Sequence, residues 1–334
     1  MPLSNRIVAI LDVGHGNSTI IKDEAGIVII DAGTKSTLLE FLLEQGIEYI
    51  DTILISHADQ DHIGGIIAIL SAGKFGIGKI RLNTDSLKGT DAWDDLLYEL
   101  DQMGVERGLD FRPSLTINDI DEYNLTGYKI QILGPSNYLA AKGPGSRDRR
   151  GRKITTNSIS AVIRILDDKD NPILLLPGDV DEIGLDDLIE HKPDASTPIL
   201  IFPHHGGLPG SRENIENFTL RLSNLIKPNT VIFSIERSDR YSTPRPEIIS
   251  TLFNYSKDIR IMCTELSGFC ANRLPIESPT HLTGVSAQGY EDRKCCAGSI
   301  IIDSSLPDPI MPLLESHHQF INNTAPTALC RLIR

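Results

Sequence analysis

The stretch that decides the fold is Ser56-His57-Ala58-Asp59-Gln60-Asp61-His62-Ile63-Gly64-Gly65. It follows the apolar run Thr52–Ile55 and precedes a second apolar run, Ile63–Leu70. These flanks predict a buried strand, a polar loop and a helix. Two imidazoles and two carboxylates fall within six residues of the loop. Such a set of N and O donors at a rigid strand end is typical of a preorganised metal site.

The spacing inside the loop supports this interpretation. Alternate residues of an extended segment point the same way, so His57, Asp59 and Asp61 share one side. The alternative is an ordinary helix N-terminus, in which Asp59 or Asp61 caps the helix and the histidines are solvated.

Two further strand ends carry groups of the same kind. Asp179 follows the apolar run Ile173–Leu176, and His204 with His205 follows the run Pro198–Phe202. Each has a simpler explanation, a helix cap for the carboxylate and a packed core histidine for the imidazole. Three strand ends that all offer metal-binding groups favour one shared site.

Apolar runs and amphipathic segments alternate along the chain, which predicts a layered α/β architecture. The intervening stretch 141–156 is rich in Gly and Arg and predicts a mobile surface loop. The pattern loosens after Asn272, so we expect a main domain at 1–272 and an extension at 273–334, packed on it or flexible beside it. The expected strands are Arg6–Val13, Ser18–Lys22, Ile27–Ile30, Thr52–Ile55, Tyr128–Leu133, Ser158–Leu166, Pro172–Leu176, Pro198–Phe202, Thr230–Ile235 and Ser299–Asp303, and the expected helices are Thr37–Gln45, Ile63–Leu70, Asp91–Met103, Glu182–Glu190 and Glu213–Ile226.

From Arg6 to Asn272 the chain resembles the metallo-β-lactamase superfamily, and more narrowly the soluble hydrolase domain of ComEC-type DNA-uptake channels. The central motif is SHADQDHIGG, in which Asp59 stands where most of the superfamily has histidine. The opening motif LDVGHGNS departs from LDVGQGDS at His15 and Asn17. The other matching segments are Ile30-Asp31-Ala32-Gly33, Asn157-Ser158-Ile159-Ser160, Leu176-Pro177-Gly178-Asp179 and His204-His205-Gly206.

The resemblance implies a four-layer αββα sandwich with two divalent metal ions at one edge. His57 and Asp59 would hold the first ion, and Asp61, His62 and His204 the second, with Asp179 bridging the two. Asp31 would orient the central loop, and Asn157 would be a weak ligand or a substrate contact.

Departures from the family pattern affect the metals. Asp59 and Asn157 in place of histidines make the first site richer in oxygen, which suits Mn²⁺ better than a histidine-rich site does. The ions implied are therefore Zn²⁺, Mn²⁺ or a mixture. Thr243, in Tyr241-Ser242-Thr243-Pro244, occupies the place of a histidine that related uptake proteins carry.

The leading functional hypothesis is a metal-dependent phosphodiesterase or nuclease acting on a nucleic acid or nucleotide. Asp61 would orient the attacking water or accept its proton. His205 would meet negative charge on the substrate, or serve a structural role, and Tyr241 would approach the site. The basic loop Arg147–Lys153 would hold a phosphate backbone, or be simply solvated. The alternatives are a hydrolase of amides, esters or small nucleotides, and a non-catalytic module with a weakened site.

Composition limits these options. The chain has 334 residues and a net charge of −13, so it repels nucleic acid overall and any contact must be local. We expect neither a signal peptide nor a membrane span, which favours a cytoplasmic protein without membrane contact. Five cysteines do not form a disulfide framework, and buried thiols are favoured over a structural zinc.

Overall fold

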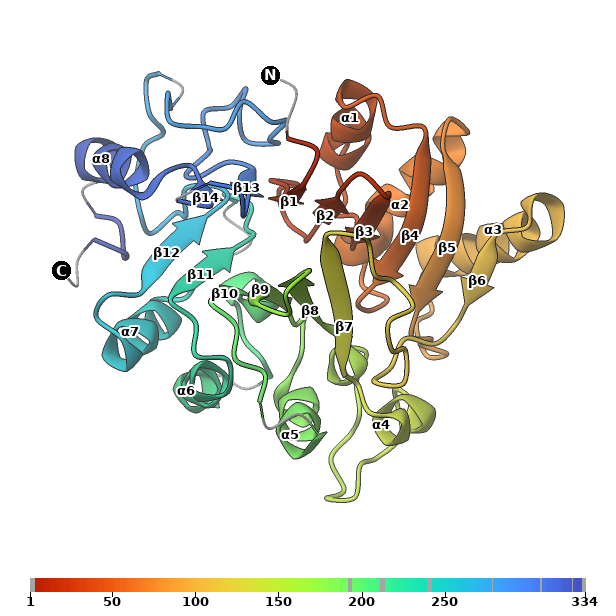
Figure 1. Ribbon diagram of the computed structural model, residues 1–334. Helices are drawn as coiled ribbons and strands as arrows, with labels where there is room; N and C mark the ends of the chain where they lie inside the picture. Colours follow the sequence, from red (N-terminus) through yellow and green to blue (C-terminus); the bar gives the residue numbers. More distant parts are fainter. Residues whose placement is uncertain are drawn as a thin grey trace.

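The computed structural model describes residues 4–191, 194–210, 214–238, 242–277, 279–306, 308–325 and 327–331. Two sheets stack in the middle of the molecule (Figure 1). The first has eight strands in the order β14-β13-β1-β2-β3-β4-β5-β6, and the second has six in the order β12-β11-β10-β9-β8-β7. The first sheet contains β1 (Ile7–Ile10), β2 (Thr19–Lys22), β3 (Ile27–Ile30), β4 (Tyr49–Ile55), β5 (Gly76–Leu82), β6 (Asp110–Arg112), β13 (Ile300–Ile302) and β14 (Ile310–Met311). The second contains β7 (Tyr128–Gly134), β8 (Val162–Asp167), β9 (Pro172–Leu176), β10 (Ile199–Ile201), β11 (Thr230–Phe233) and β12 (Arg260–Cys263).

Helices cover the outer faces of both sheets (Figure 1). The helices α1 (Thr37–Glu44), α2 (Gln60–Ala72) and α3 (Asp91–Arg107) cover the first sheet. The second sheet is covered by α5 (Glu182–His191), α6 (Ile215–Ile226), α7 (Pro246–Tyr255) and α8 (Leu314–Thr324). A short helix, α4 (Asn137–Lys142), follows β7. The αββα sandwich predicted from the sequence is therefore confirmed.

Successive side chains of β1 point to opposite faces of the first sheet, and both faces are buried. Val8 and Ile10 pack in the core between the sheets, together with residues of β8 and β9. Ile7 and Ala9 point to the opposite face and pack with α1 and α2. Because successive strand residues face opposite sides, an unbroken apolar strand needs cover on both.

The site edge is set by strand direction. β3 pairs in parallel with β4, and β9, β10, β11 and β12 run parallel in the second sheet. The loops after these strands meet where the two sheets join. Ala161 N donates to Ser56 O at 2.9 Å, and Ser234 Oγ donates to Gly16 O at 2.7 Å. Polar groups from distant segments are thereby brought to one place.

Three sequence predictions need correction. The loop expected to be extended through Asp61 ends at Asp59, and Asp61 and His62 lie in the first turn of α2. The strand expected at Ser158–Leu166 begins only at Val162, because Asn157–Ile159 forms a short 3₁₀ turn. The stretch 141–156, predicted to be a mobile loop, is an ordered and hydrogen-bonded one. Gly145 N donates to Ile154 O at 2.9 Å, and Ile154 N donates to Ser146 O at 2.9 Å.

Part of the segment predicted to be an extension belongs to the sandwich itself, because β13 and β14 are strands of the first sheet. β13 pairs antiparallel with β1, with Val8 opposite Ile302, and α8 adds Ile321 to the outer core of the second sheet. Four of the cysteines, Cys263, Cys270, Cys295 and Cys296, are buried. Among the described residues, no helix is both long and apolar enough to cross a bilayer.

Candidate metal centre

The loop after β4 is held rigidly against the loop after β3. Gly65 approaches so closely that a Cβ there would lie 2.0 Å from Ala32 O, and Gly65 N donates to Gly33 O at 2.7 Å. Asp59 occupies the N-cap position of α2, but its carboxylate contacts Lys88 and His57 instead of the helix amides. The helix-cap interpretation of Asp59 is therefore wrong, and the carboxylate faces the site.

Four side chains converge at this edge of the sandwich: Asp61, His62, Asp179 and His205. One ligand atom from each lies within 4.8 Å of all the others. His205 Nε2 is 3.1 Å from Asp61 Oδ2 and 3.9 Å from Asp179 Oδ2. His62 Nε2 is 3.5 Å from Asp179 Oδ1. Two imidazole nitrogens and two carboxylates at such spacing are a donor set that a divalent cation can bridge.

Both imidazoles of this cluster are fixed through their other nitrogen. His205 Nδ1 lies 2.8 Å from Ser234 O, and His62 Nδ1 lies 2.7 Å from Asp31 Oδ2. A carbonyl or carboxylate oxygen only accepts, so each Nδ1 carries the proton and each Nε2 presents its lone pair to the cluster when the ring is neutral. This arrangement is characteristic of metal-binding histidines.

Asp31 links the two loops. Its Oδ1 accepts from Ser56 N at 2.7 Å, and its Oδ2 accepts from Ser56 Oγ at 2.8 Å. Asp31 has a φ of 57°, and His204 and His205 have φ values of 52° and 55°. Residues other than Gly rarely adopt this left-handed conformation, and three of them lie at the edge that carries the cluster.

The electrostatics of the cluster favour positive charge. Burial raises the pKa of Asp179, but His205, His204 and His62 outweigh burial and hold that pKa well below its usual value. Burial lowers the pKa of His62, yet the carboxylates of Asp31 and Asp179 outweigh it and raise that pKa well above its usual value. A field that stabilises a proton on His62 also stabilises a metal ion at the same place.

The remaining predicted ligands lie beside this cluster. His57 Nε2 is 3.5 Å from Asp59 Oδ2, and His204 Nδ1 is 3.5 Å from Asp179 Oδ2. Nε2 of both histidines and Oδ1 of Asn157 are buried and have no hydrogen-bond partner within the described chain. Within the cluster, His62 Nε2 is likewise buried without a hydrogen-bond partner among the described residues, and this orphaned atom among two carboxylates and a second imidazole shows that the cluster fits a divalent cation.

The structure differs from the sequence prediction over the adjacent histidines. The prediction placed His204 among the ligands and gave His205 a substrate or structural role. The geometry instead brings His205 into the cluster and leaves His204 next to Asp179. Ser234 O, directly after β11, accepts from His205 Nδ1 and so directs Nε2 of His205 towards the cluster.

A cavity of about 740 Å³ opens over the cluster, and Thr243 and Asn157 both line it. The predicted contact Tyr241 lies outside the described residues. His15, which is not among the site residues predicted from the sequence, also lines the cavity. Its Nε2 lies 3.3 Å from Asp61 Oδ2 and its ring centroid lies 4.5 Å from that of His205. Burial, assisted by His205, lowers the pKa of His15 to about 4. Its departure from the family motif was the available signal.

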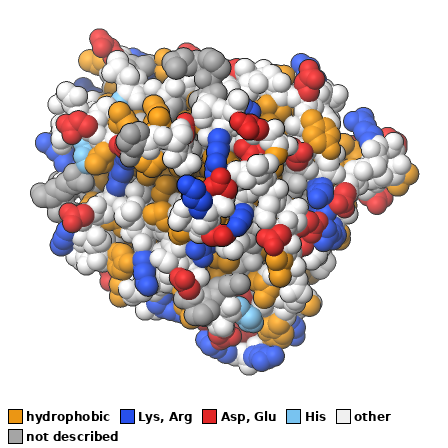
Figure 2. All heavy atoms as spheres, in the orientation of Figure 1, with side chains coloured by type: hydrophobic (Ala, Val, Ile, Leu, Met, Phe, Trp, Pro, Cys, Tyr) orange, Lys and Arg blue, Asp and Glu red, His pale blue; other side chains and the backbone are white. Residues whose placement is uncertain are grey.

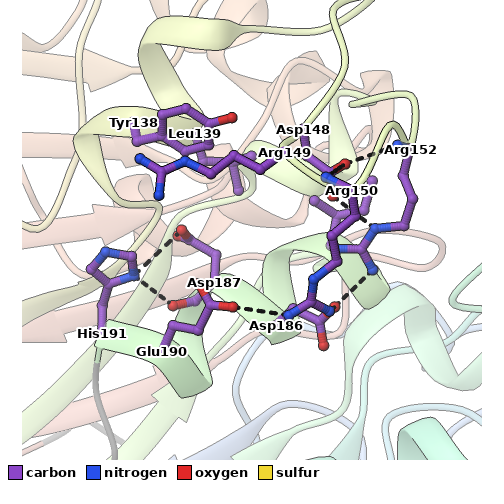
Figure 3. Close-up of a pocket in the computed structure, with 11 residues that line it drawn as sticks. Tyr138, Leu139, Asp148, Arg149, Arg150, Arg152, Asp186, Asp187, Glu190 and His191 are labelled. Carbon is purple, nitrogen blue, oxygen red and sulfur yellow. Dashed lines mark hydrogen bonds and ion pairs between the residues drawn. The ribbon is translucent and has the colours of Figure 1, made fainter.

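Two arginines of the basic loop are paired with acidic partners (Figure 3). Arg150 and Arg152 both contact Asp186, at 2.8 and 2.7 Å, and Arg150 also contacts Glu190 at 3.0 Å. The Arg149 guanidinium lies 4.8 Å from the centre of the Tyr138 ring. The loop is therefore tied to α5 by ion pairs, and on the face shown in Figure 2 acidic and basic side chains are interspersed.

Fold and site together define a class of metal-binding hydrolases, and comparison identifies the family. A model described as "Metallo-beta-lactamase superfamily" matches residues 11–209, which is more than half of the chain. The chain belongs to the metallo-beta-lactamase superfamily.

Among individual proteins, the chain is 23% identical over 282 residues to ComE operon protein 3 of Bacillus subtilis (strain 168), covering 78% of this chain and 32% of that protein. It is 24% identical over 280 residues to Recombination protein 2 of Haemophilus influenzae, covering 80% and 29% respectively. The chain thus spans about a third of the length of these relatives. Among solved structures it is similar to Igni18, a metallo hydrolase of Ignicoccus hospitalis, with a TM-score of 0.42, 15% identity and coverage of 78% of this chain and 96% of that one.

Proposed function

We propose that the protein is a metal-dependent phosphodiester hydrolase that cleaves nucleic acids or nucleotides. The observation that carries the proposal is the cluster of Asp61, His62, Asp179 and His205 at the base of an open cavity. Relatives named for recombination and competence support a nucleic-acid substrate.

The chemistry divides between the ion and the chain. A divalent cation bound here supplies an activated water and neutralises charge that develops on the phosphoryl group. The chain positions the groups around it. Asp61 orients the attacking water by accepting its hydrogen bond, and His62 and His205 present Nε2 because their Nδ1 atoms are held. His15 and Thr243, which line the cavity, contact the substrate.

The experiment is a cleavage assay on the purified chain with Mn²⁺ or Zn²⁺. The substrates are single-stranded DNA, double-stranded DNA and a cyclic dinucleotide, each assayed with EDTA as a control. We expect metal-dependent cleavage that falls at least about 100-fold in His62→Ala and His205→Ala, because each substitution removes an imidazole donor. His191→Ala is the matched control, since His191 lies on α5, away from the cluster, and bonds Asp187 O.

The proposal fails if no phosphodiester is cleaved while a lactam, thioester or peptide substrate is hydrolysed. That outcome would favour the other hydrolases of the superfamily, because one fold supports several reactions.

A further inference from the structure

A lysine ammonium lies at the edge of the candidate metal centre. Lys88 Nζ forms an ion pair with Asp59 Oδ1, while Asp59 Oδ2 lies 3.5 Å from His57 Nε2. Lys88 is 29 residues from Asp59 in the sequence, on the loop between β5 and α3, and its side chain is 23% exposed. The carboxylate expected to hold the first metal ion is therefore already shared between an ammonium and an imidazole.

The loop that carries Lys88 is fixed in place. Asp85 Oδ1 accepts from Leu87 N at 3.0 Å, and Asp85 O accepts from Lys88 N at 3.2 Å and from Trp93 Nε1 at 3.2 Å. Trp93 is buried at the start of α3. These bonds fix the backbone at Lys88, and the ion pair with Asp59 holds its ammonium at the edge of the site.

The two halves of the site differ in donor number. The group of side chains able to converge on one ion consists of Asp61, His62, Asp179 and His205, and within the described residues no second such group is found. The other half offers Asp59, which is paired, together with His57 and the amide of Asn157. A dication bound there would lie beside an ammonium in a partly buried place, where like charges repel strongly.

We propose that each chain binds one divalent cation, in the Asp61–His62–Asp179–His205 cluster, and that the Lys88 ammonium takes the place of a second cation. The inference rests on the metal centre of the proposed function but not on its substrate. A substrate phosphate would then meet one dication and one ammonium. Both neutralise phosphate charge, although lysine does so as a point charge without Lewis-acid chemistry.

The number of metal ions bound per chain tests the proposal. Isothermal titration with MnCl₂ and elemental analysis after desalting are applied to the wild type, Lys88→Met, Lys88→Arg and Lys35→Met. We expect one ion per chain in the wild type and two in Lys88→Met, because removal of the ammonium frees Asp59. Lys88→Arg keeps the charge and should bind one. Lys35 lines the same cavity and is the matched control, with one ion expected in Lys35→Met.

Electron paramagnetic resonance of the Mn²⁺-loaded samples gives a second readout, an isolated ion in the wild type and an exchange-coupled pair in Lys88→Met. Two ions in the wild type, or one ion in Lys88→Met, would overturn the inference while the proposed function stands. No bound ion in the wild type would overturn the metal centre itself and the proposed function with it.

Discussion

At the scale of single residues, the hydrogen bonds of Asp31 determine how His62 is presented to a cation. The residue does not belong to the cluster, yet it fixes the proton on His62 Nδ1 and clamps Ser56. Supporting residues of this kind control metal affinity because they select the tautomer and orientation of the ligand. A substitution that keeps the shape of Asp31 but reverses its hydrogen bond with His62 should therefore weaken metal binding.

In Asp31→Asn, the amide oxygen is needed to accept from Ser56 N, which leaves the NH₂ group facing His62. Nδ1 must then accept, and the proton of His62 moves to Nε2. We expect the dissociation constant for Mn²⁺ to rise about 10- to 100-fold with the fold retained. Titration calorimetry measures this. Asp51→Asn is the control, because Asp51 accepts from Ile27 N at the opposite end of β4. An unchanged affinity in Asp31→Asn would show that the contact has no such role.

His317 makes stability depend on pH. Burial lowers its pKa to about 3, from the usual value of 6.5, and the nearby charges of His281 and Arg260 act in the same direction. Between these two values the unfolded chain binds a proton that the folded chain does not. The contribution is therefore complete above pH 6.5 and is lost as the pH falls toward 3. From pH 7 to pH 5 the free energy of unfolding should fall by about 2 kcal/mol on this account.

Urea unfolding at several pH values checks this prediction in His317→Gln, whose stability should depend less on pH than that of the wild type. His318→Gln, on the neighbouring and less buried histidine of α8, is the control and should keep the wild-type dependence. Parallel curves for all three proteins would contradict the assignment.

At the scale of elements, helix α2 is positioned by the absence of a side chain at Gly65. Gly65→Ala would place Cβ 2.0 Å from Ala32 O. Relieving the clash must move α2 or the loop after β3, so we expect a loss of roughly 1–3 kcal/mol in unfolding free energy together with weaker metal binding. Gly104→Ala in α3 is the matched control, because its Cβ would meet Leu109 O at an ordinary 3.6 Å. That variant should gain about 0.5–1 kcal/mol. Equal effects in thermal unfolding would refute the argument.

The elements that the sequence could predict are those whose pattern is local. The apolar runs at Ile27–Ile30 and Pro172–Leu176 became β3 and β9, and polar groups at strand ends met as expected. β5 is absent from the sequence prediction although Lys79 and Arg81 alternate with Ile80 and Leu82. What the sequence does not reveal there is the burial of Arg81, whose guanidinium is paired with Asp110 and Glu122 from elsewhere in the chain.

The candidate site, like the fold, can be predicted from the sequence only in part. Ligand-rich loops are visible in the sequence, but the contact of His205 with Ser234 O and the ion pair of Lys88 with Asp59 join segments that are far apart in the chain. Contacts of this kind follow from the assembled fold and have no local signature.

At the scale of the whole molecule, ion binding and folding stability are coupled, because the cluster exists only when both sheets are assembled. A ligand that binds only the folded state at one hundred times its dissociation constant adds about 2.7 kcal/mol. We expect Mn²⁺ at that concentration to raise the unfolding free energy of the wild type by this amount relative to EDTA. His205→Ala should show little gain. Equal gains in both proteins would place the bound ion elsewhere.

The pairing of β13 with β1 has a consequence for synthesis. Ile7–Ile10 leaves the ribosome long before its neighbour Ile300–Ile302, because the two strands are far apart in the sequence. Asp12, two residues after β1, likewise acquires a late partner, Gly289 N, which donates to its carboxylate at 3.0 Å. The nascent chain therefore carries an open apolar edge until Ile300–Ile302 has been made, a state in which chaperones protect such strands from association.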